Sequence, residues 1–212
     1  MFKIWFHALF SWFIPSPYLP IPVESPAILQ SLRQETKPYH DAVEQNPFNL
    51  ALAAGTVTAT DTARFLAKMH GFLQPYEAQL QAHAAELGAE WQLDQRYRAP
   101  LILADLPQLG YSGTPPLCPA LMPLTSLAQL LGAMYVLEGS TLGGQVIARQ
   151  LDKAGIKTHA FFTGRAERTG PLWKAFCGLL TEATTNAHVD PAAVVASAIL
   201  TFQSLSAWLN QP

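Results

Sequence analysis

Four glycines interrupt a single helical pattern, and they constrain the fold of this chain more than any other feature. In residues 130–151, LLGAMYVLEGSTLGGQVIARQL, apolar residues recur at the spacing of a helix. Gly132, Gly139, Gly143 and Gly144 lie inside it, and each costs up to about 1 kcal/mol relative to alanine. Their presence indicates that something lies closer to the backbone than a Cβ atom allows. From this stretch alone, a second helix and a flat ligand explain the glycines equally well.

Composition limits the class of protein. The 212 residues suffice for one domain with a substantial core. Only 13% of the residues are charged and the formal net charge is −2, which argues against nucleic acid as a partner, because phosphate binding needs clustered Lys and Arg. Cys118 and Cys177 show neither metal-ligand spacing nor a disulfide framework. A reducing, cytoplasmic location is therefore expected.

Residues 1–26 differ from the rest of the chain. An apolar run over residues 4–14 is followed by five prolines. The run is too short to cross a bilayer, which takes about 20 residues, so no stable membrane insertion is expected. Lys3 before an apolar core resembles a secretion signal, but no small-x-small cleavage site follows. We predict a poorly ordered appendage over residues 1–26 and one domain over residues 27–212.

The domain is predicted to be all-α, because no stretch shows the two-residue alternation of a strand. The proline-rich residues 111–123 are expected to form a loop. The first expected helix spans residues 27–46, where Pro38 would kink or restart it. The second begins at a Thr60 or Asp61 cap, bends at Gly71 and Pro75 and runs to about Leu87, and the third spans residues 94–109. The glycine-rich helix is capped by Thr125 or Ser126, and the last two helices run from Pro171 to about Ala187 and from Asp190-Pro191 to Leu209.

A stripe of charged residues follows the first expected helix. Arg33, Lys37, His40 and Glu44 are spaced by four, three and four, so their side chains share one face. One interpretation is a solvated face, the usual place for such a stripe. The other places His40 on a metal, since imidazole suits iron and long cations one and two turns away suit carboxylates. Glu44 would then orient the other ring nitrogen.

Several other kinds of site are excluded by the pattern around the glycines. A phosphate loop or a dinucleotide fingerprint needs a preceding strand, and Gln145 stands where a phosphate loop carries lysine. A di-iron bundle needs paired Glu-x-x-His motifs, and a serine nucleophile of the hydrolase type needs Gly-x-Ser-x-Gly. The chain has neither motif.

Two segments together resemble the haem oxygenase family. LRQETKPYHDAVE, residues 32–44, is similar to the family's proximal helix, whose pattern is Leu-basic-x-x-Thr-x-x-x-His-x-x-x-Glu. YVLEGSTLGGQ, residues 135–145, resembles the distal helix of the bacterial, biliverdin-producing branch, with its Gly-x-x-x-Gly-Gly core. Softer matches lie in APLILADLPQLG and LTFQSLSAWL. The resemblance covers about residues 28–209.

The resemblance implies a single-domain, multi-helix bundle that holds haem between a proximal N-terminal helix and a glycine-kinked distal helix. His40 would be the axial ligand of the haem iron, and Glu44 would support its imidazole. Arg33 would pair with a haem propionate, with Lys37 beside it. Lys174 occupies a comparable basic position in the C-terminal region.

The resemblance also implies a reaction. Gly139, Gly143 and Gly144 would let the distal backbone press on the porphyrin, whereas Gly132 is expected to serve helix packing. Haem is then both cofactor and substrate, and it is opened to biliverdin with release of CO and ferrous iron. The reaction would use O₂ and electrons from an external donor such as ferredoxin or a flavin reductase. Ser140 is the expected distal polar group, and it stands where animal-type members carry an acid.

Two alternatives remain open. A non-catalytic haem carrier or sensor of the same fold is favoured by Ser140, because serine orders water but does not buffer a proton as a carboxylate does. A helical protein that binds no tetrapyrrole would use its glycines for helix packing alone.

Overall fold

The computed structural model describes residues 26–119, 121–157, 160–186 and 188–211. All regular structure in these residues is helical, which confirms the predicted fold class. The predicted appendage, apart from Pro26, lies outside the described residues.

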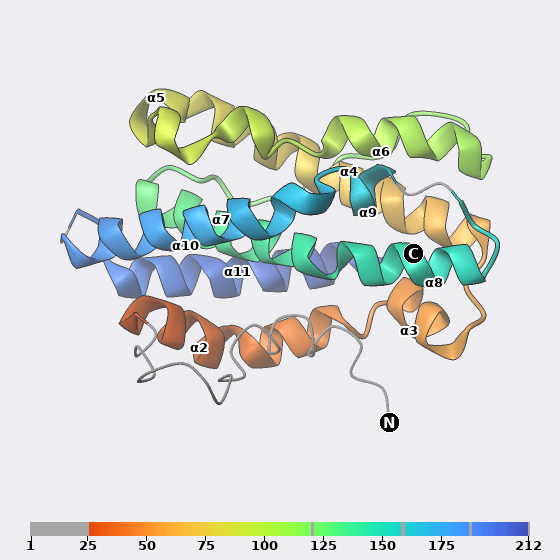
Figure 1. The fold of residues 1–212 in the computed structure, drawn as a ribbon, viewed down its shortest axis with the longest axis horizontal. Coiled ribbons are helices and arrows are strands. Elements are labelled where there is room, and N and C mark those ends of the chain that lie inside the picture. The colour runs from red at the N-terminus through yellow and green to blue at the C-terminus, as the bar shows by residue number, and fades with distance from the viewer. Residues whose placement is uncertain (1–25, 120, 158–159, 187, 212) are drawn as a thin grey trace.

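Figure 1 shows the arrangement of the helices. α2 and α3 lie along one edge, α5 and α6 lie along the opposite edge, and α7, α8, α10 and α11 lie between them. The helices are α2 (Ala27–Val43), α3 (Pro47–Ala54), α4 (Ala59–Ala82), α5 (Ala84–Leu87), α6 (Ala99–Asp105), α7 (Leu127–Gly139), α8 (Gly144–Lys153), α9 (Ala160–Thr163), α10 (Thr169–Thr185) and α11 (Pro191–Leu209). The 3-10 turns are η2 (Ala89–Trp91), η3 (Leu93–Gln95), η4 (Leu106–Leu109), η5 (Ser140–Gly143) and η6 (Ala166–Arg168).

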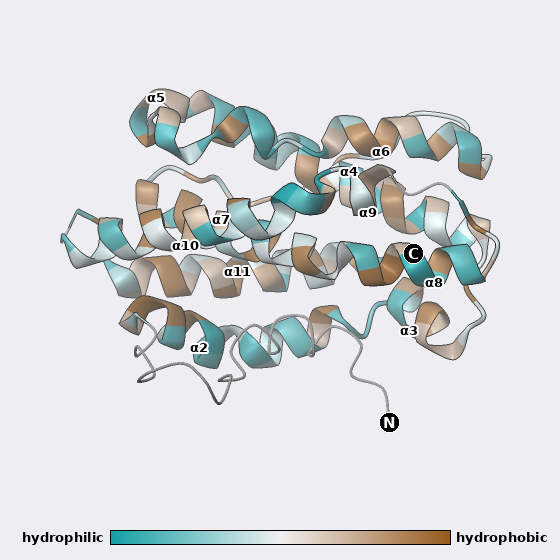
Figure 2. Cartoon of the chain, in the orientation of Figure 1, coloured by the Kyte–Doolittle hydropathy of each residue, from teal (hydrophilic) through white to brown (hydrophobic). Residues whose placement is uncertain are grey.

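α11 is the central helix of the core. It packs against α7, α2 and α4, and it buries Val194, Ala198 and Phe202. By length and composition it is apolar enough to cross a membrane. Figure 2 colours many of its residues as hydrophobic, and it packs against α7 and α2. Its apolar residues are accounted for by these helix contacts, since burying apolar surface stabilises the fold by about 25 cal/mol per Å².

α7 and α11 approach each other most closely at Gly132. A Cβ atom on Gly132 would lie 2.4 Å from the carbonyl oxygen of Val194 and 2.6 Å from the Cβ of Ser197. Both distances are shorter than van der Waals contact, so the helices would have to separate. This confirms that Gly132 serves helix packing.

Gly71 and Pro75 dock the proline-rich loop onto α4. Pro75 has no N–H, so the carbonyl four residues earlier, on Gly71, loses its helical partner. The backbone N–H of Cys118 donates to that carbonyl at 2.9 Å. A Cβ atom on Gly71 would lie 2.1 Å from the carbonyl oxygen of Pro116. α4 continues through both residues, and the loop supplies the hydrogen bond that proline removed.

The first expected helix was wrong at its C-terminal end. α2 continues through Pro38 without a restart but ends at Val43. Asn46 instead caps a separate helix, α3, because its side chain accepts a hydrogen bond from the N–H of Asn49 at 3.1 Å and Pro47 occupies the first turn. The Asn-Pro pair is a local helix-start signal.

The expected second helix was wrong at its N-cap, and it is interrupted before its predicted end. Its N-cap is Thr58, which forms a capping box with Asp61, rather than Thr60 or Asp61 itself. α4 ends at Ala82, and α5 follows after a break at His83. Gly88 follows α5 in a left-handed conformation with φ 76°, which places the predicted stop at the end of α5.

Helix boundaries after residue 90 also differ from those predicted. The expected helix 94–109 is a helix only from Ala99, between two 3-10 turns. α10 begins at Thr169, so Pro171 is its third residue rather than its first. The predicted caps Ser126 and Asp190 are confirmed, since each side chain accepts a backbone N–H of the following turn.

The glycine-rich stretch is two helices rather than one. α7 ends at Gly139, the chain tightens into the 3-10 turn η5, and α8 starts at Gly144. A mid-helix 3-10 segment is common where a sequence serves a functional site. We call residues 139–144 the distal turn.

Candidate functional site

A cavity of about 590 Å³ lies among α2, the distal turn, the connection between α9 and α10, and α11. This volume falls in the range of small-molecule and cofactor sites, about 300–1,000 Å³. Most of the predicted site residues line it, namely Arg33, Lys37, His40, Glu44, Gly139, Ser140 and Gly144. The cavity therefore brings together the histidine stripe and the glycine-rich stretch, which are about a hundred residues apart in the sequence.

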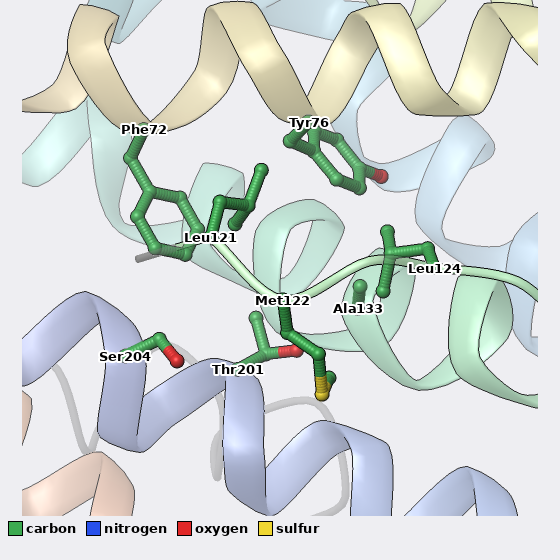
Figure 3. A pocket seen from close by; sticks show the side chains of 8 residues that line it. All are labelled: Phe72, Tyr76, Leu121, Met122, Leu124, Ala133, Thr201 and Ser204. Carbon is green, nitrogen blue, oxygen red and sulfur yellow. The ribbon is translucent and has the colours of Figure 1, made fainter. Parts of the chain in front are cut away.

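A second, much smaller cavity lies between α4, the proline-rich loop and α11 (Figure 3). Its volume is about 10 Å³, and Phe72, Tyr76 and Met122 are among the side chains around it. That space holds at most one water molecule. It is a packing gap and not a ligand site.

His40 points from α2 into the large cavity. Its side chain is 19% exposed, and its ring meets the ring of Phe202 edge-on at a centroid distance of 5.7 Å. Burial lowers the pKa of His40, so the imidazole is neutral near pH 7. Neutral imidazole is the form that coordinates a metal.

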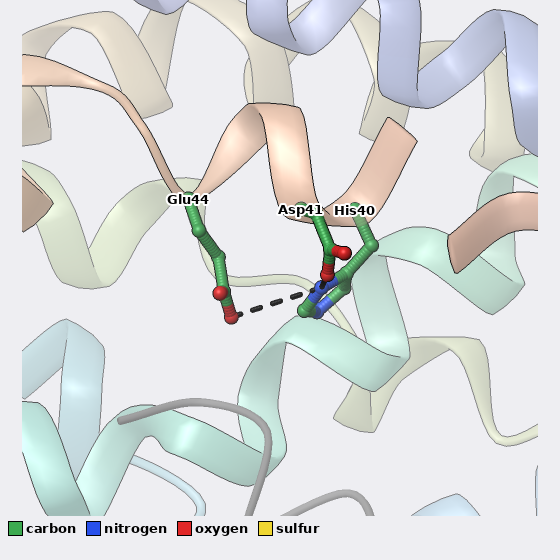
Figure 4. A group of neighbouring side chains, drawn as sticks. All are labelled: His40, Asp41 and Glu44. Atoms are coloured by element: carbon green, nitrogen blue, oxygen red, sulfur yellow. Dashed lines mark ion pairs between the residues drawn. The ribbon is translucent and has the colours of Figure 1, made fainter. Parts of the chain in front are cut away.

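Glu44 lies one helical turn after His40 (Figure 4). Its Oε1 is 3.7 Å from Nδ1 of His40. Burial, and then the negative charge of Asp41, raise the pKa of Glu44 to about 7. The same Oε1 is buried without a hydrogen-bond partner among the described residues. A buried acceptor beside an imidazole nitrogen is the arrangement that orients a metal-binding histidine.

Two cations lie on α2 before His40. Arg33 and Lys37 are exposed and line the cavity. Lys37 donates to Asp41 at 2.6 Å, and both of these side chains are nearly half exposed. Such a surface pair contributes at most about 1 kcal/mol. Exchange of Asp41 for an anionic group of a ligand would therefore cost this ion pair little.

Another part of the cavity wall is aromatic. Phe65, Phe161 and Phe162 line it. The ring of Phe65 stacks on that of Phe48 at 4.2 Å and lies nearly parallel to that of Phe162 at 6.3 Å. Exposed cations on α2 together with these rings suit a flat, apolar molecule that carries carboxylates.

The distal turn contains glycines of two kinds. A Cβ atom on Gly144 would lie 2.2 Å from the carbonyl oxygen of Phe162, so contact with α9 already requires glycine there. A Cβ atom on Gly139 would meet only the ring of Trp173, at 3.7 Å, which is ordinary contact. Gly139 therefore leaves open space toward the cavity that protein packing does not need.

Ser140 is held by hydrogen bonds on both sides of its hydroxyl group. Its Oγ donates to the carbonyl oxygen of Leu137 at 2.7 Å and accepts from Nη2 of Arg98 at 3.2 Å. The same Nη2 donates to the Leu137 carbonyl at 2.7 Å. Because the single hydroxyl proton is committed to Leu137, Ser140 offers the cavity an acceptor rather than a donor.

Glu138 is fixed between two arginines. Its Oε2 accepts from Nη1 of Arg96 at 2.6 Å and from Nη1 of Arg165 at 2.8 Å. The Glu138 side chain is only 4% exposed. Glu138 is not among the residues that line the cavity. It anchors the end of α7 and does not replace the missing distal acid.

Two predicted site residues lie elsewhere. Lys174 is exposed on α10 and is absent from the cavity lining, whereas its neighbour Trp173 lines it. One residue along a helix turns the side chain by about 100°, which places Lys174 on the solvent face. Gly143 is buried in the distal turn and also does not line the cavity.

Arg98 and Arg165 line the cavity and were not predicted. Both belong to segments without a helical stripe or a known motif. Buried arginine is uncommon, so the sequence offered no reason to place these residues in a site. The only signal was RYR, with Arg96 and Arg98 next to an apolar run, and it does not identify a partner.

Comparisons with known proteins show which proteins the chain resembles. No protein-family model matches the chain. A curated heme oxygenase of Xanthomonas campestris pv. campestris (strain 8004) is 33% identical over 163 residues, which cover 74% of this chain and 91% of that protein. The structure of a heme oxygenase from Leptospira interrogans has a similar fold, with a TM-score of 0.71 over 87% of this chain and 98% of that one, at 17% identity.

Proposed function

The chain belongs to the haem oxygenase family, and we propose that it opens haem to biliverdin with release of CO and ferrous iron. It would use O₂ and electrons from an external donor such as ferredoxin or a flavin reductase, in the cytoplasm. The observation that carries the proposal is one cavity lined both by a neutral, partly buried histidine and by a glycine whose missing Cβ leaves space for a ligand.

The residues around the cavity fit haem. One axial imidazole, cations for two propionates and aromatic walls for the macrocycle are what a haem pocket requires. Glu44 provides the most specific support, because its buried Oε1 has no partner among the described residues and lies next to Nδ1 of His40. With Nδ1 on that side, Nε2 would be the nitrogen available to the haem iron, and Arg33 and Lys37 would hold the propionates.

Haem supplies the iron that activates O₂ and the ring that is oxidised. The residues of this chain bind and orient it. Gly139 lets the distal turn approach the porphyrin face, and Ser140 accepts hydrogen bonds from water beside it. Arg98 fixes Ser140 and contributes a buried positive charge. A neutral imidazole lacks the electron push of a thiolate ligand, which suits an enzyme that does not cleave O–O to act on other substrates.

A haem titration followed by turnover tests this proposal. Haem is expected to give a Soret band at one haem per protein, and ascorbate or reduced ferredoxin with O₂ should then replace that band with a biliverdin spectrum and release CO. The product isomer identifies the meso carbon attacked. A haem spectrum that survives reductant and O₂ would contradict the catalytic proposal.

A non-catalytic haem carrier or sensor is the second candidate. It is favoured by one observation, which is that the distal turn presents Ser140 with its proton already donated to a backbone carbonyl. A carrier would bind haem reversibly and return it unchanged to an acceptor protein. Biliverdin formation distinguishes the two functions in the same experiment.

A further inference from the structure

The wall of the cavity is not held in the same way on all sides. α2, α7 and α11 contribute buried apolar residues to the core, and moving any of them would expose that surface to water. Residues 164–168, which join α9 to α10, are different. Their 3-10 turn η6 buries no residue, yet Arg165 and Ala166 line the cavity. This segment is a piece of cavity wall held by polar contacts.

Arginine contacts hold the 164–168 segment in place. Nη1 of Arg165 donates to Oε2 of Glu138 at 2.8 Å, and Nη2 donates to Oε1 at 3.2 Å. Arg165 also donates to the carbonyl of Arg96, and Arg168 donates to the side chain of Gln95. The Arg165–Glu138 ion pair is the buried one, with side chains 8% and 4% exposed. It ties the segment to the last turn of α7.

Three features oppose this closed position. Ala166 has φ 34°, in the left-handed region that disfavours residues with a Cβ atom. Nε of Arg165 is buried without a hydrogen-bond partner among the described residues, which is costly for a charged group. Burial, and then the charge of Arg165, lower the pKa of Arg98 to about 10, which shows that these two cations repel each other. The Arg165–Glu138 ion pair therefore holds the segment closed against the backbone strain at Ala166, the unpaired Nε of Arg165 and the repulsion between Arg165 and Arg98.

Opening the segment would leave no unpaired charge on α7. Nη1 of Arg96 still donates to Oε2 of Glu138 at 2.6 Å if Arg165 moves away. The severe cost of a buried ion pair arises when one charge is left without a partner. Arg96 prevents that, and Arg165 would be solvated once the segment moved outward.

We propose that the 164–168 segment is a movable wall of the cavity, closed by the Arg165–Glu138 ion pair, that sets how fast the ligand enters and the product leaves. The proposal rests on the proposed function, since it takes haem as the ligand. A movable wall would also serve that function. The ring-opened product is no longer flat, so its release requires a wider opening than the entry of planar haem.

The test compares the rates of haem uptake and release in Arg165→Gln. A wall that opens more readily speeds passage in both directions. Both rate constants should rise about tenfold, the factor that corresponds to about 1.4 kcal/mol, while Kd stays within about twofold. Uptake is followed by the Soret band after rapid mixing, and release by transfer of haem to excess apomyoglobin. Arg149→Gln, which removes an exposed arginine of α8 outside the cavity lining, is the matched control and should change neither rate.

Ala166→Gly provides a second, opposite test. Glycine accepts φ 34° without steric cost, so the closed position gains stability and both rates should fall. This variant decides the question if Arg165→Gln does not fold. Faster release with a proportionally weaker Kd in Arg165→Gln would indicate direct haem contact and overturn the movable wall. So would unchanged rates, or a rise in both rates in Ala166→Gly.

The two proposals fail in different ways. If the wild-type protein gives no Soret band with haem, the proposed function is wrong and the movable wall falls with it. If haem binds and is degraded but the rates in Arg165→Gln match those in Arg149→Gln, only the movable wall is wrong.

Discussion

At the scale of single residues, His40 is the group on which the site depends. Its pKa is lowered by burial, and its ring is packed against Phe202, so the neutral imidazole is held ready in one orientation. The charged stripe on α2 allowed a solvated face as well as a metal site. Partial burial of His40 and Glu44 argues against a solvated face for the last two members, while Arg33 and Lys37 are exposed.

His40→Ala is expected to shift the Soret band and weaken haem binding more than about a hundredfold, since even the outer partners of metal ligands contribute about 10- to 100-fold. Haem titration by absorbance measures both effects, and added imidazole should restore the wild-type band. His83→Ala, at the end of α4 and away from the cavity lining, is the control. An unchanged Soret band in His40→Ala would show that His40 is not the axial ligand of the haem iron.

Glu44 is expected to make the haem-free protein less stable as pH rises. Its pKa is raised from 4.5 to about 7 in the folded state, so folding favours the protonated form. That contribution is fully present below about pH 4.5 and is lost as pH rises through 7. Linkage limits it to about 3 kcal/mol.

Glu44→Gln should remove this loss, because glutamine stays neutral. Urea unfolding of the haem-free protein between about pH 5 and 8 measures the free energy of unfolding. Glu35→Gln, at an exposed position of the same helix, should retain the wild-type pH dependence. If the free energy of unfolding changes equally with pH in Glu44→Gln and in the wild type, the pKa of Glu44 is not raised in the folded protein.

At the scale of elements, the α7–η5–α8 unit gives its glycines different roles. Gly132 meets α11, Gly144 lines the cavity but is required by its contact with α9, and Gly139 lines the cavity with only an ordinary contact to Trp173. A second helix and a ligand were the two explanations of the pattern, and both are supported, each at different positions.

Gly132→Ala and Gly139→Ala are expected to have opposite effects. The first forces a methyl group within 2.4 Å of the carbonyl oxygen of Val194, and overpacking of this kind costs about 1–3 kcal/mol. The second adds a methyl group at ordinary contact with Trp173 and removes a helix-breaking glycine, worth up to about 1 kcal/mol. Thermal unfolding should show a lower Tm for the first variant and an equal or higher Tm for the second.

The haem affinity of Gly139→Ala tests whether the space beside this residue serves the ligand. Gly139→Ala should weaken haem binding despite its stability, because the new methyl group occupies the space left for the ligand. Wild-type haem affinity in Gly139→Ala would mean that the distal turn does not contact haem at that residue.

At the scale of the whole molecule, haem is expected to act as part of the core. A ligand that binds only the folded state stabilises it by about 2.7 kcal/mol at a free concentration one hundred times its Kd. Calorimetry or circular dichroism with and without haem measures this shift in Tm. His40→Ala should lose most of it at the same haem concentration. A protein whose glycines served helix packing alone would show no shift.

Patterns that repeat along one helix were predictable from the sequence. The all-helical class, the register of His40 and Glu44 on one face, the caps Ser126 and Asp190, and the packing role of Gly132 follow from local periodicity and capping chemistry. The start of α3 at Asn46-Pro47 was also encoded locally, although we did not predict it.

Contacts between distant segments were decided by the tertiary structure. The chain folds Arg98 against Ser140 and Arg165 against Glu138, joining residues that share no helix face and no motif. The free space at Gly139, the packing of Gly144 against Phe162 and the solvent position of Lys174 depend equally on neighbours far along the chain. The sequence by itself determined which residues share a helix face, because that depends on a fixed rise and turn per residue. Only packing decided which faces meet across the cavity, because burial and charge pairing arise when distant segments come together.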